Sequence, residues 1–159
     1  MSRYRIVTLT KDVANTVRTT LRSPQYGHPA HVELASGFGP CRSCLSTFRE
    51  GQEDRILFTY NAFSGTNITP MPGPVFIHQA SCPRYIDTTF PADLNKLDLL
   101  LEGYNSEGRV LAVENPEIGK AEDSILNILA NNEVKLINIR NAKAGCFVTR
   151  VERSILEAV

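Results

Sequence analysis

The sequence predicts an α+β protein, with a mainly antiparallel sheet of six to eight strands and two amphipathic helices packed on it. Two observations carry this prediction. Runs of β-branched and aromatic residues outnumber the segments with helical periodicity. The runs also come in neighbouring pairs joined by short turns, which is typical of antiparallel hairpins and not of a doubly wound parallel sheet. The length of 159 residues fits a single domain over 1–159.

Eight segments rich in β-branched, aromatic and other apolar residues predict strands. They are 3–10, 31–35, 56–60, 75–78, 97–104, 109–113, 134–140 and 146–153. The turn at 105–108 contains Asn and Gly, which suit a positive φ angle, so the strands on either side are expected to pair as a hairpin. Gly145 is expected to relieve the backbone in the same way in the turn at 141–145.

Two segments have the apolar spacing of an amphipathic helix. The first is 11–22, where Thr10 is expected to cap the helix and Pro24 follows its end. Its narrow apolar stripe is expected to lie against the sheet. The second is 116–132, with acidic residues early and two asparagines at its end.

Charge and hydropathy exclude some partners. Seventeen basic residues balance seventeen acidic ones, so the chain lacks the broad positive field that favours nucleic acids or anionic membranes. The nearest approach to a basic patch is Arg140, Lys143, Arg150 and Arg153. No run of about 18 apolar residues is present, and the start of the chain has no apolar signal segment. We therefore expect a cytoplasmic protein whose four cysteines are reduced.

The segment 23–51 is rich in Gly, Pro, Ser and His and is expected to be largely irregular. Within it Cys41 and Cys44 have the spacing with which one chain segment binds a zinc ion through two thiolates. A zinc site needs further ligands. The candidates for these positions are His78, Cys82 and Cys146.

The same residues permit two other interpretations. Cys41 beside Arg42 could have a lowered pKa and act as a nucleophile or redox centre, alone or as a dithiol with Cys44. Alternatively, the cysteines are inert and pack as small apolar side chains, with His78 a structural histidine. The spacing alone leaves these three interpretations open.

Arginines near the cysteines suggest a ligand pocket. By the two-residue period of a strand, Cys146 and Arg150 would face the same space, as would Asn138 and Arg140. If Arg42, Arg140 and Arg150 converge near Cys41, the site would favour an anion such as a carboxylate or phosphate.

Three motifs together resemble one family. They are the segments 37–42, 73–76 and 141–153, which contain Gly-Phe-Gly-Pro-Cys-Arg, Gly-Pro-Val-Phe and Asn-Ala-Lys-Ala-Gly-Cys-Phe followed by Arg-Val-Glu-Arg. In this respect the chain is similar to a family of small bacterial proteins designated domain of unknown function 1203. The resemblance implies no activity, cofactor or substrate. It implies that any function shared across the family involves Cys41, Arg42, Asn141 and Cys146.

The leading hypothesis is a non-enzymatic protein that binds zinc or a small ligand in a pocket lined by cysteine and arginine. The candidate ligand-binding residues are Cys41, Arg42, Arg140, Asn141, Cys146 and Arg150, and the candidate metal ligands are Cys41, Cys44, His78, Cys82 and Cys146. The alternative is a thiol-dependent enzyme or redox protein that uses Cys41. A third hypothesis is an interaction module that adds a partner strand to an exposed sheet edge.

Overall fold

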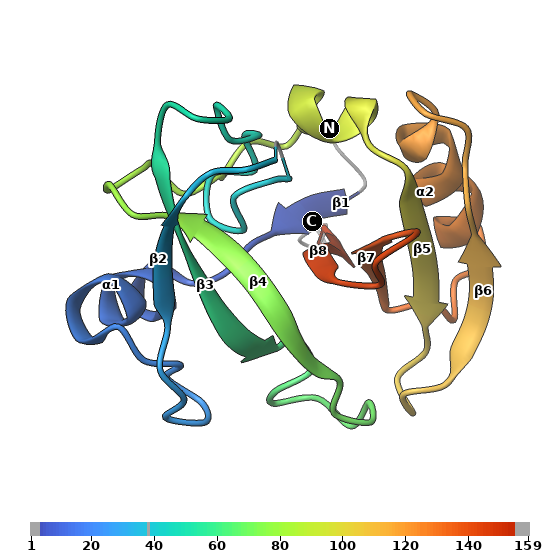
Figure 1. Cartoon of the computed structure of the whole chain (residues 1–159). Coiled ribbons are helices and arrows are strands. Elements are labelled where there is room, and N and C mark those ends of the chain that lie inside the picture. Colours follow the sequence, from blue (N-terminus) through green and yellow to red (C-terminus); the bar gives the residue numbers. More distant parts are fainter. Residues whose placement is uncertain (1–3, 38, 155–159) are drawn as a thin grey trace.

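The computed structural model describes residues 4–37 and 39–154, which form eight antiparallel strands in two sheets, together with two α-helices and a 3-10 helix. The α+β prediction is confirmed. Figure 1 shows the two sheets side by side, with α1 (Lys11–Thr20) beside the smaller sheet and α2 (Ala121–Leu129) beside the larger one. Arg3 of the expected first strand and Phe38 of the first motif lie outside the described residues.

The larger sheet has five strands in the order β1-β8-β7-β5-β6. Their bounds are Tyr4–Val7 for β1, Leu99–Tyr104 for β5, Val110–Glu114 for β6, Leu136–Asn141 for β7 and Phe147–Arg153 for β8. Alternate residues of β5 and β7, together with Val148 and Val151 of β8, join Ile125 and Ile128 of α2 in one buried core. Gly103 of β5 permits the close approach of α2, because a Cβ atom there would lie 2.7 Å from Ile128 Cγ2.

The smaller sheet has three strands in the order β2-β3-β4. Their bounds are His31–Leu34 for β2, Asp54–Asn61 for β3 and Pro72–His78 for β4. Ile56, Phe58, Val75 and Ile77 form its buried face, and Val17 of α1 packs into the same core. Thr10 caps α1 as expected, since its hydroxyl accepts a hydrogen bond from the backbone N–H of Val13.

The grouping of the strands and the bounds of two elements differ from the sequence-based expectation. The strands divide between two sheets because β2, β3 and β4 pair only with one another, whereas β1 crosses to pair with β8. The first strand ends at Val7, which leaves Thr8 and Leu9 to connect it to the helix cap. The second helix begins only at Ala121, because Gly119 has a φ of +91° that a right-handed helix does not allow, and Ile118 is 63% exposed.

Both expected hairpins are present. The β5–β6 turn is closed by Asn105, whose Oδ1 accepts hydrogen bonds from the N–H groups of Glu107 and Arg109, and Gly108 has a φ of +79°. The β7–β8 turn is closed in the same way by Asn141, whose Oδ1 accepts from Lys143 and Ala144. The side-chain oxygen of Asn141 is therefore occupied within its own turn.

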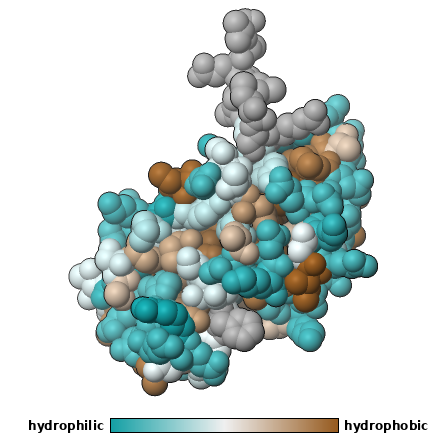
Figure 2. All heavy atoms as spheres, turned by 90° about the horizontal axis from the view of Figure 1, so that it is seen from above, coloured by the Kyte–Doolittle hydropathy of each residue, from teal (hydrophilic) through white to brown (hydrophobic). Residues whose placement is uncertain are grey.

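The surface is mostly hydrophilic, in keeping with the charged residues of the sequence. In the view of Figure 2, hydrophilic residues cover most of the face, and hydrophobic ones appear in small groups among them. In the part of the chain that the structure describes, neither helix has the length or apolar character to cross a bilayer.

Candidate functional site

Cys41 and Cys44 lie in a tight loop whose backbone is fixed at both ends. The N–H of Cys41 donates to the carbonyl of Ser46, and the N–H of Leu45 donates back to the carbonyl of Cys41. Leu45 adopts a left-handed conformation with φ of +59°, and its side chain is buried in the core of the larger sheet. The burial of this side chain compensates the unfavourable backbone angle. In the resulting turn the two thiols lie within 4.8 Å of each other.

The loop places its two thiols against the end of β4. The described residues contain one group of four side chains whose potential metal-ligand atoms all lie within 4.8 Å of one another, and these are Cys41, Cys44, His78 and Cys82. The sulfur atoms of Cys41 and Cys82 are 3.8 Å apart, and Cys44 Sγ is 3.5 Å from His78 Nδ1. We refer to these residues as the Cys3His cluster. Cys41 is completely buried, whereas the other three are partly exposed.

A second layer of side chains orients the Cys3His cluster. Glu53 Oε1 lies 3.2 Å from His78 Nε2, the ring nitrogen that faces away from the sulfur atoms. Arg18 of α1 donates from Nη2 to Cys82 Sγ at 3.3 Å and from Nε to the carbonyl of His78 at 3.0 Å. The backbone N–H of His78 points to Cys41 Sγ at 3.4 Å. Such donors to sulfur, and a carboxylate on the outer ring nitrogen, are typical surroundings of metal-binding cysteine and histidine.

Without a metal, the cluster would share its protons unevenly. Hydrogen bonds from Cys44, Cys82 and His78 lower the pKa of Cys41, while hydrogen bonds with Cys41 and Cys82 raise the pKa of Cys44. Hydrogen bonds with Cys41 and Cys82 raise the pKa of His78 to about 10, and the charge of Glu53 acts in the same direction. In the metal-free cluster these pKa shifts favour a thiolate on Cys41 and a protonated ring on His78.

Arg42 connects the cysteine loop to the last hairpin. Its guanidinium is buried and donates from Nε to the carbonyl of Phe147 and from Nη1 to the carbonyl of Pro40, both at 2.7 Å. Burial lowers the pKa of Arg42 to about 10, although the nearby Cys146 and Cys41 raise it in part. The bond from Nε to Phe147 joins the loop to the last hairpin, and the bond from Nη1 to Pro40 fixes the guanidinium within its own loop.

The remaining candidate residues lie apart from the Cys3His cluster. Cys146 is not a member of it, and its thiol makes only a weak contact of 3.9 Å with the carbonyl of Ala144. Arg150 donates to the carbonyl of Ala62 and pairs with Glu152 at 3.5 Å. Arg140 lies 3.3 Å from Glu102. The three arginines thus have separate partners, and the cation beside the cluster sulfur atoms is Arg18.

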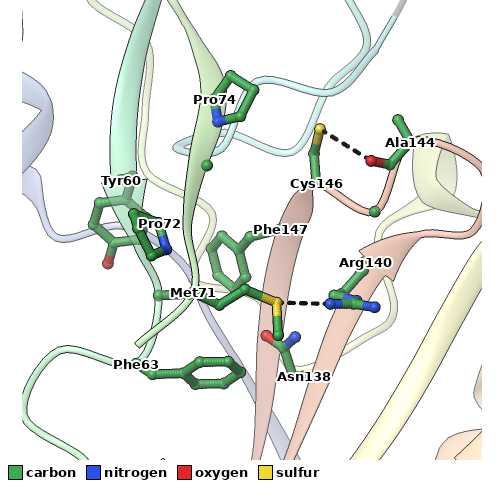
Figure 3. Close-up of a pocket in the computed structure, with 13 residues that line it drawn as sticks. Tyr60, Phe63, Met71, Pro72, Pro74, Asn138, Arg140, Ala144, Cys146 and Phe147 are labelled. Atoms are coloured by element: carbon green, nitrogen blue, oxygen red, sulfur yellow. Dashed lines mark hydrogen bonds between the residues drawn. The ribbon is translucent and has the colours of Figure 1, made fainter. Parts of the chain in front are cut away.

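Cys146 and Arg140 line a cavity of about 210 Å³ where the two sheets meet. Figure 3 shows Asn138 and Arg140 on β7 facing Met71 at the entrance to β4, with aromatic side chains along the wall. The aromatic side chains are Tyr60, Phe63 and Phe147. Burial raises the pKa of Tyr60, although Arg150 and Arg84 act against it, so this wall is uncharged at neutral pH. Arg150 is not part of the lining.

Arg18 and Glu53 are the site residues that sequence reasoning missed. Arg18 occupies the last turn of α1, where a basic residue is equally expected for the helix dipole. Glu53 precedes β3 in a polar turn and has no distinguishing neighbour in the sequence. Only the packing of α1 and β3 around β4 brings them to the cluster.

Comparison with known proteins identifies the family. The family model described as Protein of unknown function (DUF1203) matches residues 38–153, which is well over half of the chain. The chain therefore belongs to this family, and the resemblance noted from its three motifs is confirmed. No curated protein and no solved structure matches the chain.

Proposed function

We propose that this DUF1203 protein is a non-enzymatic zinc protein, in which the Cys3His cluster binds one zinc ion that stabilises the fold. The observation that carries the proposal is the convergence of four ligand atoms within 4.8 Å of one another. Three cysteines and one histidine form a common ligand set of structural zinc sites.

Two separations within the cluster match those around a tetrahedral ion. Bonds of about 2.3 Å to sulfur and about 2.0–2.1 Å to nitrogen require sulfur atoms about 3.8 Å apart and a sulfur–nitrogen separation of about 3.5 Å. The observed values are 3.8 Å between Cys41 and Cys82 and 3.5 Å between Cys44 and His78 Nδ1. A disulfide would instead bring two sulfur atoms to about 2.05 Å.

The surroundings support zinc over inert packing. Apolar burial of a cysteine needs no carboxylate or guanidinium nearby, yet Glu53 contacts the outer nitrogen of His78 and Arg18 donates to Cys82. The Glu53 contact would keep the proton on Nε2 and leave Nδ1 free for the ion. Arg18 would offset part of the negative charge of three thiolates.

A zinc ion here would act on the fold rather than on a substrate. All four coordination positions would be filled by protein, whereas catalytic zinc sites keep one position open. The ion would join the cysteine loop, the end of β4 and the segment around Cys82. The loop and the Cys82 segment lie outside the helices and strands, and β4 ends at His78. The alternative of a Cys41-dependent enzyme is less well supported because the Cys41 side chain is 0% exposed and cannot meet an external substrate.

Metal analysis of the untagged protein tests the proposal. We expect about one zinc per chain by inductively coupled plasma mass spectrometry after dialysis, and loss of that zinc in Cys82→Ser. Cys146→Ser is the matched control, since Cys146 is also a partly exposed free cysteine but lies outside the Cys3His cluster. Metal-free wild-type protein, or equal zinc loss in both variants, would reject the proposal.

A further inference from the structure

The cavity at the meeting of the sheets contains a buried acceptor without a donor. Asn138 is 1% exposed, and among the described residues its Oδ1 has no hydrogen-bond partner. Its Nδ2 donates to Glu102 Oε1 at 3.2 Å, and a carboxylate can only accept there. The amide orientation is therefore fixed, with Oδ1 left unpaired beside the cavity that Asn138 lines. A buried acceptor without a donor is unfavourable, so this position suits a donor from a ligand.

Arg140 supplies the complementary donor. Its Nε lies 3.3 Å from the same Glu102 oxygen but is not aligned for a hydrogen bond, and its Nη1 points at the thioether sulfur of Met71 at 2.7 Å. A thioether is a weak acceptor, so this N–H is poorly satisfied by the protein. Asn138 Nδ2 and Arg140 Nε both approach one Glu102 oxygen, so the two side chains are neighbours in the cavity wall. Figure 3 shows both facing Met71, whose sulfur lies against Arg140.

The cavity also restricts the charge, shape and size of a ligand. Glu102 already balances Arg140, and its buried carboxylate would repel a second anion. The opposite wall is aromatic, and the ring centroids of Tyr60 and Phe147 are 5.8 Å apart. Such a wall favours a flat ring as ligand. A volume of about 210 Å³ corresponds to about seven water molecules at about 30 Å³ each. A single small ring fits this space.

We propose that this cavity binds an uncharged planar ring that carries a lactam edge, meaning an adjacent N–H and C=O, as pyridones and pyrimidine bases do. The ring N–H donates to Asn138 Oδ1, and the ring C=O accepts from the Arg140 guanidinium. The aromatic side chains contact the faces of the ring. Cys146 lies at the end of the cavity nearest the β7–β8 turn and limits the space for the ligand there.

Nuclear magnetic resonance on the intact chain tests this proposal with three matched probes. 2-Pyridone has the lactam edge, N-methyl-2-pyridone lacks its donor, and benzoate carries a full negative charge. We expect 2-pyridone to shift the amide resonances of Gly73 and Gly145, which line the cavity, in a saturable manner. Its affinity should exceed that of the N-methyl analogue by about tenfold, the value of one neutral hydrogen bond. Equal affinities, preferential binding of benzoate, or no saturable shift at millimolar 2-pyridone would overturn the proposal.

Two variants separate the roles of the side chains. Asn138→Leu keeps the approximate shape and removes the acceptor, so it should weaken 2-pyridone binding by about tenfold and abolish the preference over the N-methyl analogue. Arg109→Met is the control, because Arg109 is an exposed arginine outside the lining and should leave both affinities unchanged. Should Asn138→Leu fail to fold, the probe comparison on the unmodified chain still decides the question.

Discussion

The sulfur atoms of Cys41 and Cys82 lie 3.8 Å apart although 41 positions separate the two residues in the chain. Between them the chain forms the cysteine loop, β3 and β4, so their meeting is a product of the whole smaller sheet. A contact of this length between two thiols gains little by itself, because sulfur is a weak hydrogen-bond partner. A zinc ion bound by both sulfur atoms would explain why the fold brings them together.

The Glu53 carboxylate is expected to tune the affinity for zinc without binding it. Glu53→Gln should weaken zinc binding by about 10–100-fold, because the His78 ring loses the charged acceptor that fixes its orientation. Competition with a chromophoric chelator measures the change. Glu50→Gln is the matched control, since Glu50 is an exposed glutamate in the same turn region. Equal zinc affinities of Glu53→Gln and Glu50→Gln would show that Glu53 does not influence zinc binding.

Zinc affinity is expected to fall as the pH falls. In the metal-free protein the pKa of His78 is raised to about 10 by hydrogen bonds with Cys41 and Cys82, and hydrogen bonds with the same two residues raise the pKa of Cys44. Zinc requires a neutral imidazole and a thiolate, so at least these two groups must release their protons on binding. Two released protons correspond to about a hundredfold weaker binding for each unit of pH below neutrality.

Calorimetry checks the proton release directly. Titration of metal-free protein with zinc in buffers of different ionisation enthalpy yields the number of protons exchanged. We expect a net release of about two or more at neutral pH. A binding reaction that exchanged no protons would contradict the proton distribution within the Cys3His cluster.

Arg42 is expected to stabilise the protein by its two buried hydrogen bonds. Arg42→Met keeps the apolar stem but leaves the carbonyls of Phe147 and Pro40 without their donor. We expect a decrease in the free energy of unfolding of about 1–3 kcal/mol, measured by urea denaturation at saturating zinc. Arg109→Met, at an exposed arginine, should change it by less than about 0.5 kcal/mol. A decrease in Arg42→Met no larger than that of the control would contradict this role.

Gly103 is expected to tolerate no side chain. In Gly103→Ala the new methyl group would lie 2.7 Å from Ile128 Cγ2 and 3.3 Å from Val134 Cγ1, so α2 must move away from the sheet. Overpacking of this kind costs about 1–3 kcal/mol. At Gly37 a methyl group would meet nothing within 4 Å and the backbone needs no positive φ, so Gly37→Ala should be close to neutral. Thermal unfolding of the two variants gives the comparison.

The elements of the fold follow from local patterns, whereas their arrangement does not. Periodicity and turn residues predict both helices and both hairpins, because these depend on neighbours in the sequence. The division into two sheets depends on β1 pairing with β8 across nearly the whole chain. A strand pattern indicates which residues are buried but not which strand lies alongside, so one sheet and two sheets are equally compatible with the sequence.

The same distinction applies to the site. The spacing of Cys41 and Cys44 predicts that their thiols lie together, and His78 and Cys82 belong to the same expected set. The sequence alone does not decide whether Cys82 or Cys146 belongs to the site, because both are single cysteines far along the chain from Cys44. The two-residue period also fails near Cys146, since a bulge in the β7–β8 pairing places Val148 and Val151 in the same core.

X-ray absorption at the zinc K edge tests the central claim most directly. We expect a four-coordinate ion with three sulfur atoms at about 2.3 Å and one nitrogen at about 2.0–2.1 Å, unchanged in Cys146→Ser. A first shell dominated by oxygen and nitrogen, or one that loses a sulfur in Cys146→Ser, would contradict the assignment of zinc to Cys41, Cys44, His78 and Cys82.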